Sequence, residues 1–236
     1  MKRRDLLAGL AAAAAASGCT SQAPRRAQAS PAPGRAQPSP APYASPVPLP
    51  PPQVTGTISL ENAIGERRSR RAFRPDPLPA ATIGQLLWAG QGVTSPDGKR
   101  AAPSAGALYP LELYAVTAQQ VMHYLPDGHR AETRAASDLR PELQAAALGQ
   151  SSAGAAPVVI AVTAVPGCLS HRYGAKAGEY AQIEVGHASQ NILLQAAALG
   201  LGAVPVGSLD PARVAATLAL PPDQTVLYLI PVGHVP

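Results

Sequence analysis

The sequence predicts an α+β domain over residues 54–236, and three features of its pattern support this fold class. Helical and strand patterns are mixed here without the strict strand–helix alternation of a doubly wound sheet. Residues 157–165 form a near-continuous apolar run, which is typical of a central strand. Residues 178–199 carry two adjacent apolar stripes at helical spacing, so we expect a long helix that is central or lies in a subunit interface.

An export signal precedes this domain at residues 1–19. A basic start is followed by an apolar run over residues 6–16, which is too short to remain as a membrane-spanning helix. Arg3 and Arg4 with the leucines that follow look like a twin-arginine signal, whose machinery exports folded proteins. Residues 16–19 resemble a bacterial lipobox, which would make Cys19 a lipid-carrying first mature residue. The alternative is a plain cleaved signal peptide.

Residues 20–53 are predicted to be a disordered tether. They are rich in Pro, Ala, Ser and Gln and hold 11 of the 27 prolines, without apolar periodicity. At about 3.1 Å per residue in polyproline II, such a tether reaches on the order of 100 Å. We expect it to hold the domain away from a membrane, and a Pro-rich ligand for a partner is the alternative.

The charge and the cysteines exclude two classes of function. The formal net charge is +5, and residues 1–53 alone carry six Lys and Arg against one Asp, so the domain itself is neutral. A neutral domain argues against a nucleic-acid partner. Cys168 has no second cysteine or metal ligand at a suitable spacing, and the five histidines are scattered, so no metal site is expected.

Local signals predict the remaining elements. Ser59 is a suitable N-cap for a helix over residues 59–68, and Gly200 ends the long helix. Asp127 and Gly128 form a turn that begins a third strand. Further helices are expected over residues 80–90, 138–148 and 211–218, strands over 111–117, 121–125 and 225–232, and extended chain over 201–206.

Three segments suit one flat, phosphate-bearing ligand. Residues 67–71 offer four arginines and a serine, which suit a phosphate. Residues 103–109 leave their main-chain N–H groups almost bare, between prolines that discourage helix. Residues 205–208 form a second small-residue loop. Each segment taken separately has a commoner interpretation: the first is a solvated basic face, the second an ordinary surface turn and the third a helix cap.

Taken together, the segments resemble the nitroreductase family of FMN flavoproteins, and most closely its SagB/thiazole-oxidase-like branch. The resemblance covers residues 58–236 and rests on six motifs in order: RRSRRAF at 67–73, LLWAGQG at 86–92, APSAGALYP at 102–110, GHASQN at 186–191, LGLGAVPVG at 199–207 and PVG at 231–233. It implies an α+β fold with a central, mostly antiparallel sheet flanked by helices. It also implies a homodimer that holds FMN at the subunit interface.

The same resemblance implies roles for individual residues. It assigns the FMN phosphate and ribityl chain to the basic run, the flat ring to the bare segment, and the region near flavin N5 to the second loop. The implied contacts are Arg67, Arg68, Ser69 and Arg71, then Pro103, Ser104, Ala105 and Gly106, then Val206 and Gly207.

Two positions depart from the family pattern. Family members often carry a basic residue just past the last motif, where His234 stands here. Azoline-oxidising members use a Lys–Tyr pair, and its nearest match here is Arg172 with Tyr173. Because arginine is not a practical proton acceptor, Tyr173 is either a proton donor or a packing residue.

The function expected from the sequence is therefore an exported, lipid-anchored, FMN-dependent oxidoreductase. It would move a hydride through flavin to or from a small-molecule or peptide substrate, with a protein as candidate electron donor. The alternatives are a partner-dependent maturation subunit and a binding lipoprotein without redox activity.

Overall fold

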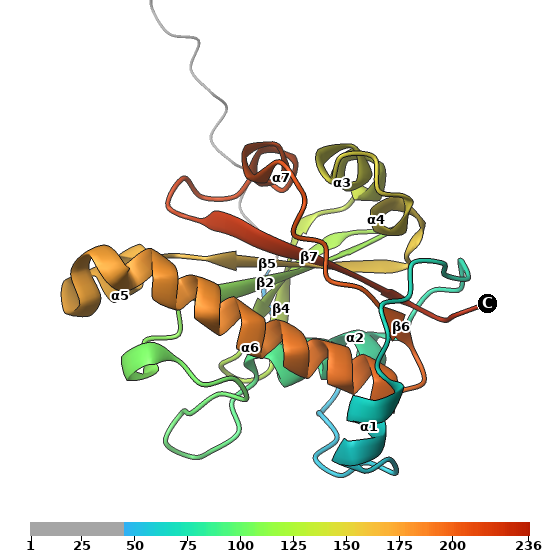
Figure 1. The fold of residues 1–236 in the computed structure, drawn as a ribbon, viewed down its shortest axis with the longest axis horizontal. Coiled ribbons are helices and arrows are strands. Elements are labelled where there is room, and N and C mark those ends of the chain that lie inside the picture. Colours follow the sequence, from blue (N-terminus) through green and yellow to red (C-terminus); the bar gives the residue numbers. More distant parts are fainter. Residues whose placement is uncertain (1–44) are drawn as a thin grey trace, which may run out of the picture. The chain divides into compact units, whose positions relative to one another are not determined.

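A computed structural model describes residues 45–236, which fold around a seven-stranded sheet (Figure 1). The predicted signal peptide with Cys19, and residues 20–44 of the predicted tether, lie outside the described residues. The strands follow the order β1-β4-β3-β2-β5-β7-β6, and every neighbouring pair is antiparallel. Their bounds are β1 Val47–Pro48, β2 Leu111–Thr117, β3 Val121–Leu125, β4 Arg130–Ala135, β5 Val158–Ala164, β6 Gly202–Ala203 and β7 Thr225–Gly233.

Helices cover both faces of this sheet (Figure 1). The long helix α6 (Ala177–Ala198) and α2 (Ala80–Gln91) lie on one face, and α1 (Leu60–Glu66) packs against α6. The opposite face carries α3 (Arg140–Ala146), α4 (Ser151–Ala155) and α7 (Pro211–Thr217). The α+β prediction and the long central helix are confirmed.

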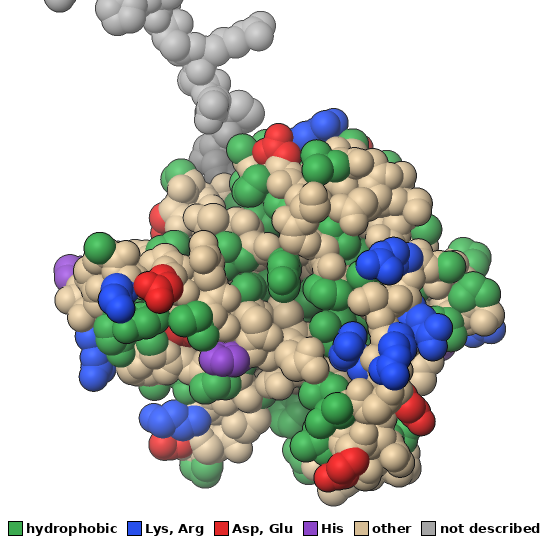
Figure 2. Space-filling model, viewed as in Figure 1, with side chains coloured by type: hydrophobic (Ala, Val, Ile, Leu, Met, Phe, Trp, Pro, Cys, Tyr) green, Lys and Arg blue, Asp and Glu red, His purple; other side chains and the backbone are tan. Residues whose placement is uncertain are grey.

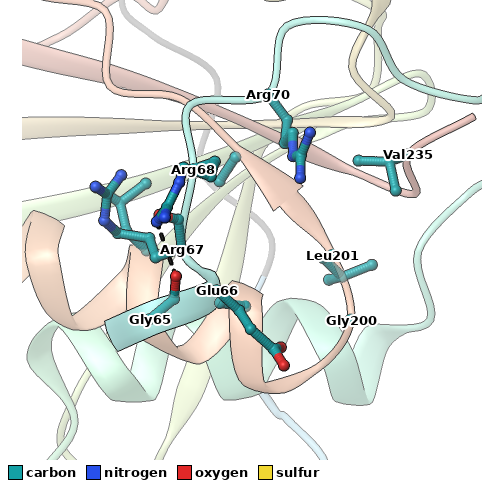
Figure 3. A pocket seen from close by; sticks show the side chains of 11 residues that line it. Gly65, Glu66, Arg67, Arg68, Arg70, Gly200, Leu201 and Val235 are labelled. Carbon is teal, nitrogen blue, oxygen red and sulfur yellow. Dashed lines mark hydrogen bonds between the residues drawn. The ribbon is translucent and has the colours of Figure 1, made fainter. Parts of the chain in front are cut away.

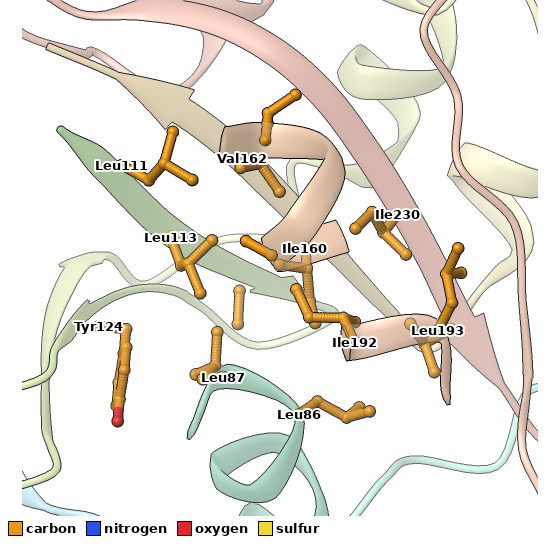
Figure 4. Packing of buried hydrophobic residues seen from close by; sticks show 14 of the residues in the cluster. Leu86, Leu87, Leu111, Leu113, Tyr124, Ile160, Val162, Ile192, Leu193 and Ile230 are labelled. Atoms are coloured by element: carbon orange, nitrogen blue, oxygen red, sulfur yellow. The ribbon is translucent and has the colours of Figure 1, made fainter. Parts of the chain in front are cut away.

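The central strands divide their side chains between two cores, because successive residues of a strand point to opposite faces. On β2, Leu111 and Leu113 pack towards α6 and α2, while Tyr114 packs towards α3 and α7. Figure 4 shows the first core, where Ile192 of α6 meets Ile160 of β5 and Leu87 of α2. β5 is buried along its whole length, as its continuous apolar run predicts.

The predicted elements occur close to their expected bounds. Ser59 caps α1, because its Oγ accepts the N–H of Asn62 at 3.2 Å. The extended chain expected over residues 201–206 is a strand only at β6, with an isolated bridge from Val206 to Leu229 further on. Four short helices were not predicted: α4, α5 (Gly167–Tyr173), and the 3-10 turns η1 (Ala105–Ala107) and η2 (Gly174–Lys176).

The predicted end of the tether at residue 53 is wrong, because residues 47–53 are bound to the domain. β1 pairs with β4, and the N–H of Leu49 donates to the His129 carbonyl at 3.0 Å. The amide of Gln85 on α2 holds the backbone of Gln53 on both sides, at 2.7 and 3.0 Å. The folded part therefore begins near residue 47. Among residues 45–236, no helix is both long and apolar enough to cross a bilayer.

Candidate cofactor site

The basic run at residues 67–71 lies at the β6 edge of the sheet (Figure 1). Arg67 ends α1 as its C-cap, and the chain continues in an extended form. Ser69 makes a parallel bridge to Ala203, and the N–H of Arg70 donates to the Ala203 carbonyl at 3.0 Å. Two segments far apart in the sequence therefore lie side by side here.

A cavity of about 440 Å³ opens beside this contact. Its walls come from the end of α1, the basic run, β6 and the C-terminal half of α6. Figure 3 shows the guanidinium of Arg70 between those of Arg67 and Arg68 on one side and the apolar side chains of Leu201 and Val235 on the other. The cavity thus combines a cationic wall with an apolar one.

The guanidinium groups at this cavity have no carboxylate partner within residues 45–236. Arg74, further along, pairs with Asp76 at 3.2 Å, but no ion pair forms at Arg67, Arg68 or Arg70. Glu66 also lines the cavity and offsets one of the three charges, which leaves the lining cationic. Blue side chains gather over this edge in Figure 2. A phosphate, which accepts several N–H bonds at once, fits this donor set.

Arg68 has a second role at the end of α1. Its Nη1 donates to the carbonyls of Gly65 at 2.8 Å and of Arg67 at 2.7 Å, as the dashed line in Figure 3 shows for Gly65. These carbonyls belong to the last turn of the helix, where backbone acceptors lack intrahelical partners. The guanidinium is therefore held in a fixed place at the cavity wall.

The cavity lining only partly matches the expected phosphate contacts. Arg67 and Arg68 line the cavity, whereas Ser69 and Arg71 do not. Arg70, which was not among the expected contacts, takes their place. Arg68 and Arg70 lie on one side of the extended chain and Ser69 and Arg71 on the other, because alternate residues of such a chain point to opposite sides. The sequence alone does not indicate which side of the run meets a cavity.

The bare segment at residues 103–109 is folded into a tight turn with a left-handed backbone. The φ angles are +63° at Gly106, +55° at Ala107 and +49° at Tyr109. Ser104 Oγ accepts the N–H of Tyr109 at 2.8 Å, which closes the turn. Left-handed conformations at non-glycine residues are strained and cluster at ligand-binding sites.

This segment rests on the N-terminal half of α6. Pro103, Ser104 and Ala105 line a small cavity of about 120 Å³ together with Glu184 and His187. The N–H of Ala105 donates to Glu184 Oε1 at 2.8 Å. Glu184 was not predicted as a site residue, although its place beside the apolar stripe of Ala181, Val185 and Ala188 could have indicated it.

Tyr173 lies next to the bare segment. Its ring packs edge-on against Tyr180, with centroids 4.9 Å apart. A Cβ atom added at Gly106 would come within 2.9 Å of both Tyr173 Oη and Arg172 Nη1. Tyr173 therefore packs against α6 and also presents its hydroxyl to the segment, so the geometry is compatible with both of its predicted roles.

The second small-residue loop is tied to β7. Val206 is buried and exchanges backbone hydrogen bonds with Leu229 at 2.8 and 3.1 Å. Gly207 lies against the ring of Tyr228, where a Cβ atom would come within 2.8 Å. This loop continues from Ala203 and so starts beside the basic run.

One chain does not bring all three segments to a common cavity. The bare segment meets α6 at Glu184, whereas the basic cavity meets it at Leu193 and Ala197. At about 1.5 Å per residue, these contacts are about 14 to 20 Å apart along the helix.

Large apolar side chains are exposed on α1 and α6, with Leu60 61%, Ile64 54% and Ile183 49% exposed.

The fold and the basic cavity define an α+β protein with a cationic edge beside its longest described helix. Comparison with protein families matches residues 64–234 to the family described as the Nitroreductase family. The chain belongs to this family, which is a family of oxidoreductases.

Individual relatives agree with this assignment. A protein of Methanocaldococcus jannaschii that is named as a candidate nitroreductase is 35% identical over 183 residues, which cover 75% of this chain and 91% of that protein. A crystal structure from Ralstonia eutropha JMP134, also described as a candidate nitroreductase, has a TM-score of 0.74 at 26% identity and covers 82% of this chain and 90% of its own. The NADPH:FMN oxidoreductase of Vibrio harveyi shares the fold, with a TM-score of 0.57 at 22% identity, covering 75% of this chain and 68% of its own.

Proposed function

We propose that the protein is an FMN-dependent oxidoreductase of the SagB/thiazole-oxidase-like branch. The observation that carries the proposal is the cluster of Arg67, Arg68 and Arg70 around one cavity without a carboxylate partner in the described chain. A terminal phosphate supplies the charge that this cluster lacks. The branch assignment rests on the six sequence motifs over residues 67–233.

We further propose that the active form is a homodimer. The bare segment and the basic cavity are apart on one chain, so a second copy is needed to bring them to one FMN. The exposed apolar side chains of Leu60, Ile64 and Ile183 lie on the two helices that would meet the partner. Burying them would stabilise the dimer by about 1.5 to 3 kcal/mol for each side chain that becomes fully buried.

The basic run and the bare segment then have defined roles in holding FMN. FMN, when bound, supplies hydride acceptance and donation in ping-pong fashion. The arginines hold its phosphate. The two N–H groups of the bare segment that have no acceptor in the described chain, those of Ser104 and Gly106, provide fixed donors. Fixed donors and cations stabilise negative charge that develops on a ligand.

The proposed place of action is the cell envelope, with the chain exported through its signal and anchored by a lipid at Cys19. NAD(P)H is scarce outside the cytoplasm, so the electron donor is proposed to be a protein or a substrate being oxidised. The acceptor is a small molecule or a peptide. Metabolic labelling with radioactive palmitate should mark the wild-type chain and leave Cys19→Ser unlabelled, whereas equal labelling would exclude this anchor.

The core of the proposal is tested by cofactor binding. We expect the purified chain to carry, or to take up, one FMN per subunit, and the bound flavin to be reduced by an added donor. A colourless protein that takes up no FMN overturns the proposal. Bound FMN that no donor reduces would instead indicate a binding lipoprotein, and activity that appears only with added partner proteins would indicate a maturation subunit.

Oligomeric state provides a separate check. Sedimentation should show a dimer, and Ile183→Asp should yield monomers that bind FMN weakly, because the charge would be buried without a partner. Arg213→Ala, on the opposite face in α7, is the control and should change neither property. A monomeric wild type that binds FMN tightly would contradict the shared site.

A further inference from the structure

The buried side of α6 includes an acidic side chain, Glu184, which is only 4% exposed. Acidic residues are almost never this buried unless they are paired. Within residues 45–236 no Lys, Arg or His forms an ion pair with Glu184. The described partner is instead a backbone donor, the N–H of Ala105, at 2.8 Å. A leucine of similar volume would suit this position better if packing were its only task.

The bare segment around Ala105 has a strained backbone, which other parts of the fold must hold in place. Gly106, Ala107 and Tyr109 have left-handed backbones, and two of them are not glycine. Such conformations persist only where the surroundings fix them. The bonds inside the turn, from Tyr109 to Ser104 Oγ and from Ala107 to the Ser104 carbonyl, shape it without attaching it to the rest of the fold.

α6 attaches this segment at Glu184 and the chain just before it at a second point. Besides Glu184, Asn191 donates through Nδ2 to the Ala101 carbonyl at 3.2 Å. Glu184 and Asn191 are seven residues apart, two helical turns, and so they lie on the same side of α6. The first attachment is at the wall of the small cavity that Ser104 and Ala105 also line, and is thus within reach of a ligand there.

We propose that Glu184 is a positioning residue, whose carboxyl group fixes the backbone of residues 103–107 on α6 in the shape that contacts the flavin ring. This inference rests on the proposed function for the identity of the ligand, whereas the positioning itself is a property of the chain alone. Glu184 acts through Ala105 and is given no part in the chemical step.

Three variants separate a hydrogen bond from packing and from charge. Glu184→Leu keeps the volume and removes the acceptor, and Glu184→Gln keeps an acceptor and removes the charge. Ala105→Pro removes the donor from the other side. Ser104 before it is extended (φ −135°, ψ 142°), which is the conformation that a residue preceding proline adopts.

Two measurements on the full-length chain detect the effect of these substitutions. Amide hydrogen exchange over residues 102–109 is followed without cofactor, and FMN affinity is followed by fluorescence titration. In Glu184→Leu we expect exchange at Ala105 to accelerate by about tenfold or more, and the Kd for FMN to rise by about fivefold or more. Glu184→Gln should restore both to within about threefold of wild type. Ala105→Pro should weaken FMN as Glu184→Leu does, and the double variant should be no weaker.

The outcomes are decisive in either direction. Equal behaviour of Glu184→Leu and wild type, or a loss in Glu184→Gln as large as in Glu184→Leu, overturns the inference. So does full additivity of Glu184→Leu with Ala105→Pro. If Glu184→Leu does not fold, the other two variants carry the test. Glu184→Gln should stay within about threefold of wild type and Ala105→Pro should raise the Kd for FMN by about fivefold or more, and failure of either expectation overturns the inference. If the wild type binds no FMN, the proposed function fails, and the exchange data still decide whether Glu184 positions the segment.

Discussion

Arg140 holds Asp138 with two parallel hydrogen bonds at the start of α3, from Nε to Oδ1 at 2.8 Å and from Nη2 to Oδ2 at 2.6 Å. The same guanidinium donates through Nη1 to the Ala156 carbonyl at 3.0 Å, which ties α3 to the chain that enters β5. The hydrogen bonds from Arg140 lower the pKa of Asp138 below its ordinary value of 3.8.

This ion pair predicts a loss of stability in acid. Because the pKa of Asp138 is lower in the folded chain, its contribution is present above about pH 3.8 and is lost as pH falls through the folded value. Urea unfolding of the wild type and Asp138→Asn should therefore differ at pH 7 and converge towards pH 2.5. If the stabilities of wild type and Asp138→Asn differ by the same amount at both pH values, Asp138 is not stabilised by its charge.

Gly106→Ala tests the left-handed turn of the bare segment. The substitution should lower the free energy of unfolding by about 1 to 2 kcal/mol, because a Cβ atom is strained at a φ of +63°. It should also weaken FMN binding, since the new Cβ presses on Tyr173 Oη and Arg172 Nη1. Gly98→Ala is the matched control, at a φ of +79° with no neighbour within 4 Å. It should cost similar stability and leave FMN affinity unchanged, and equal weakening by both variants would refute a local effect.

Tyr173→Phe separates the two roles of this residue. The phenylalanine ring keeps the edge-on contact with Tyr180, so we expect an unchanged melting temperature. We also expect turnover within about twofold of wild type, because packing accounts for the position of the ring. A fall in kcat of a hundredfold, with KM unchanged, would instead identify the hydroxyl as a proton donor, since general acids contribute about that much or more.

Arg70→Ala and Arg71→Ala should differ in their effect on FMN. Arg70 lines the basic cavity and Arg71 does not. A charge-assisted hydrogen bond contributes about 1.5 to 3 kcal/mol, so calorimetry should show FMN affinity falling by about tenfold or more in Arg70→Ala. Riboflavin, which lacks the phosphate, should bind both variants alike. A larger loss in Arg71→Ala would place the phosphate on the other side of the run.

The sequence predicts the regular elements well where one signal dominates. The apolar run of β5 predicts a buried strand, and β5 is buried along its length. Of the two stripes predicted for α6, the one with Ala181, Val185 and Ala188 is buried, whereas the one with Ile183 is partly exposed. The hairpin of β2 and β3 has its predicted bounds. Composition misled only at residues 47–53, where prolines suggest a free tether but backbone groups of Leu49 and Gln53 find partners on the domain.

The site was less predictable, for a physical reason. Motifs indicate which segments matter, but the side of an extended chain that meets a cavity depends on its neighbour, which here is Ala203. The pairing of Glu184 with Ala105 joins residues far apart in the sequence, and a single buried acid in a helix does not reveal its partner. The short helices α4 and α5 carry no strong periodic signal of their own, and their existence depends on tertiary packing.

The two outermost strands of the sheet are β1 and β6. β1 is the first strand of the described chain and forms one margin, and β6 forms the other, beside the basic run. Six strand spacings separate them, about 29 Å at 4.8 Å each. The proposed N-terminal anchor would therefore extend from the margin of the sheet opposite the arginines of the proposed cofactor site.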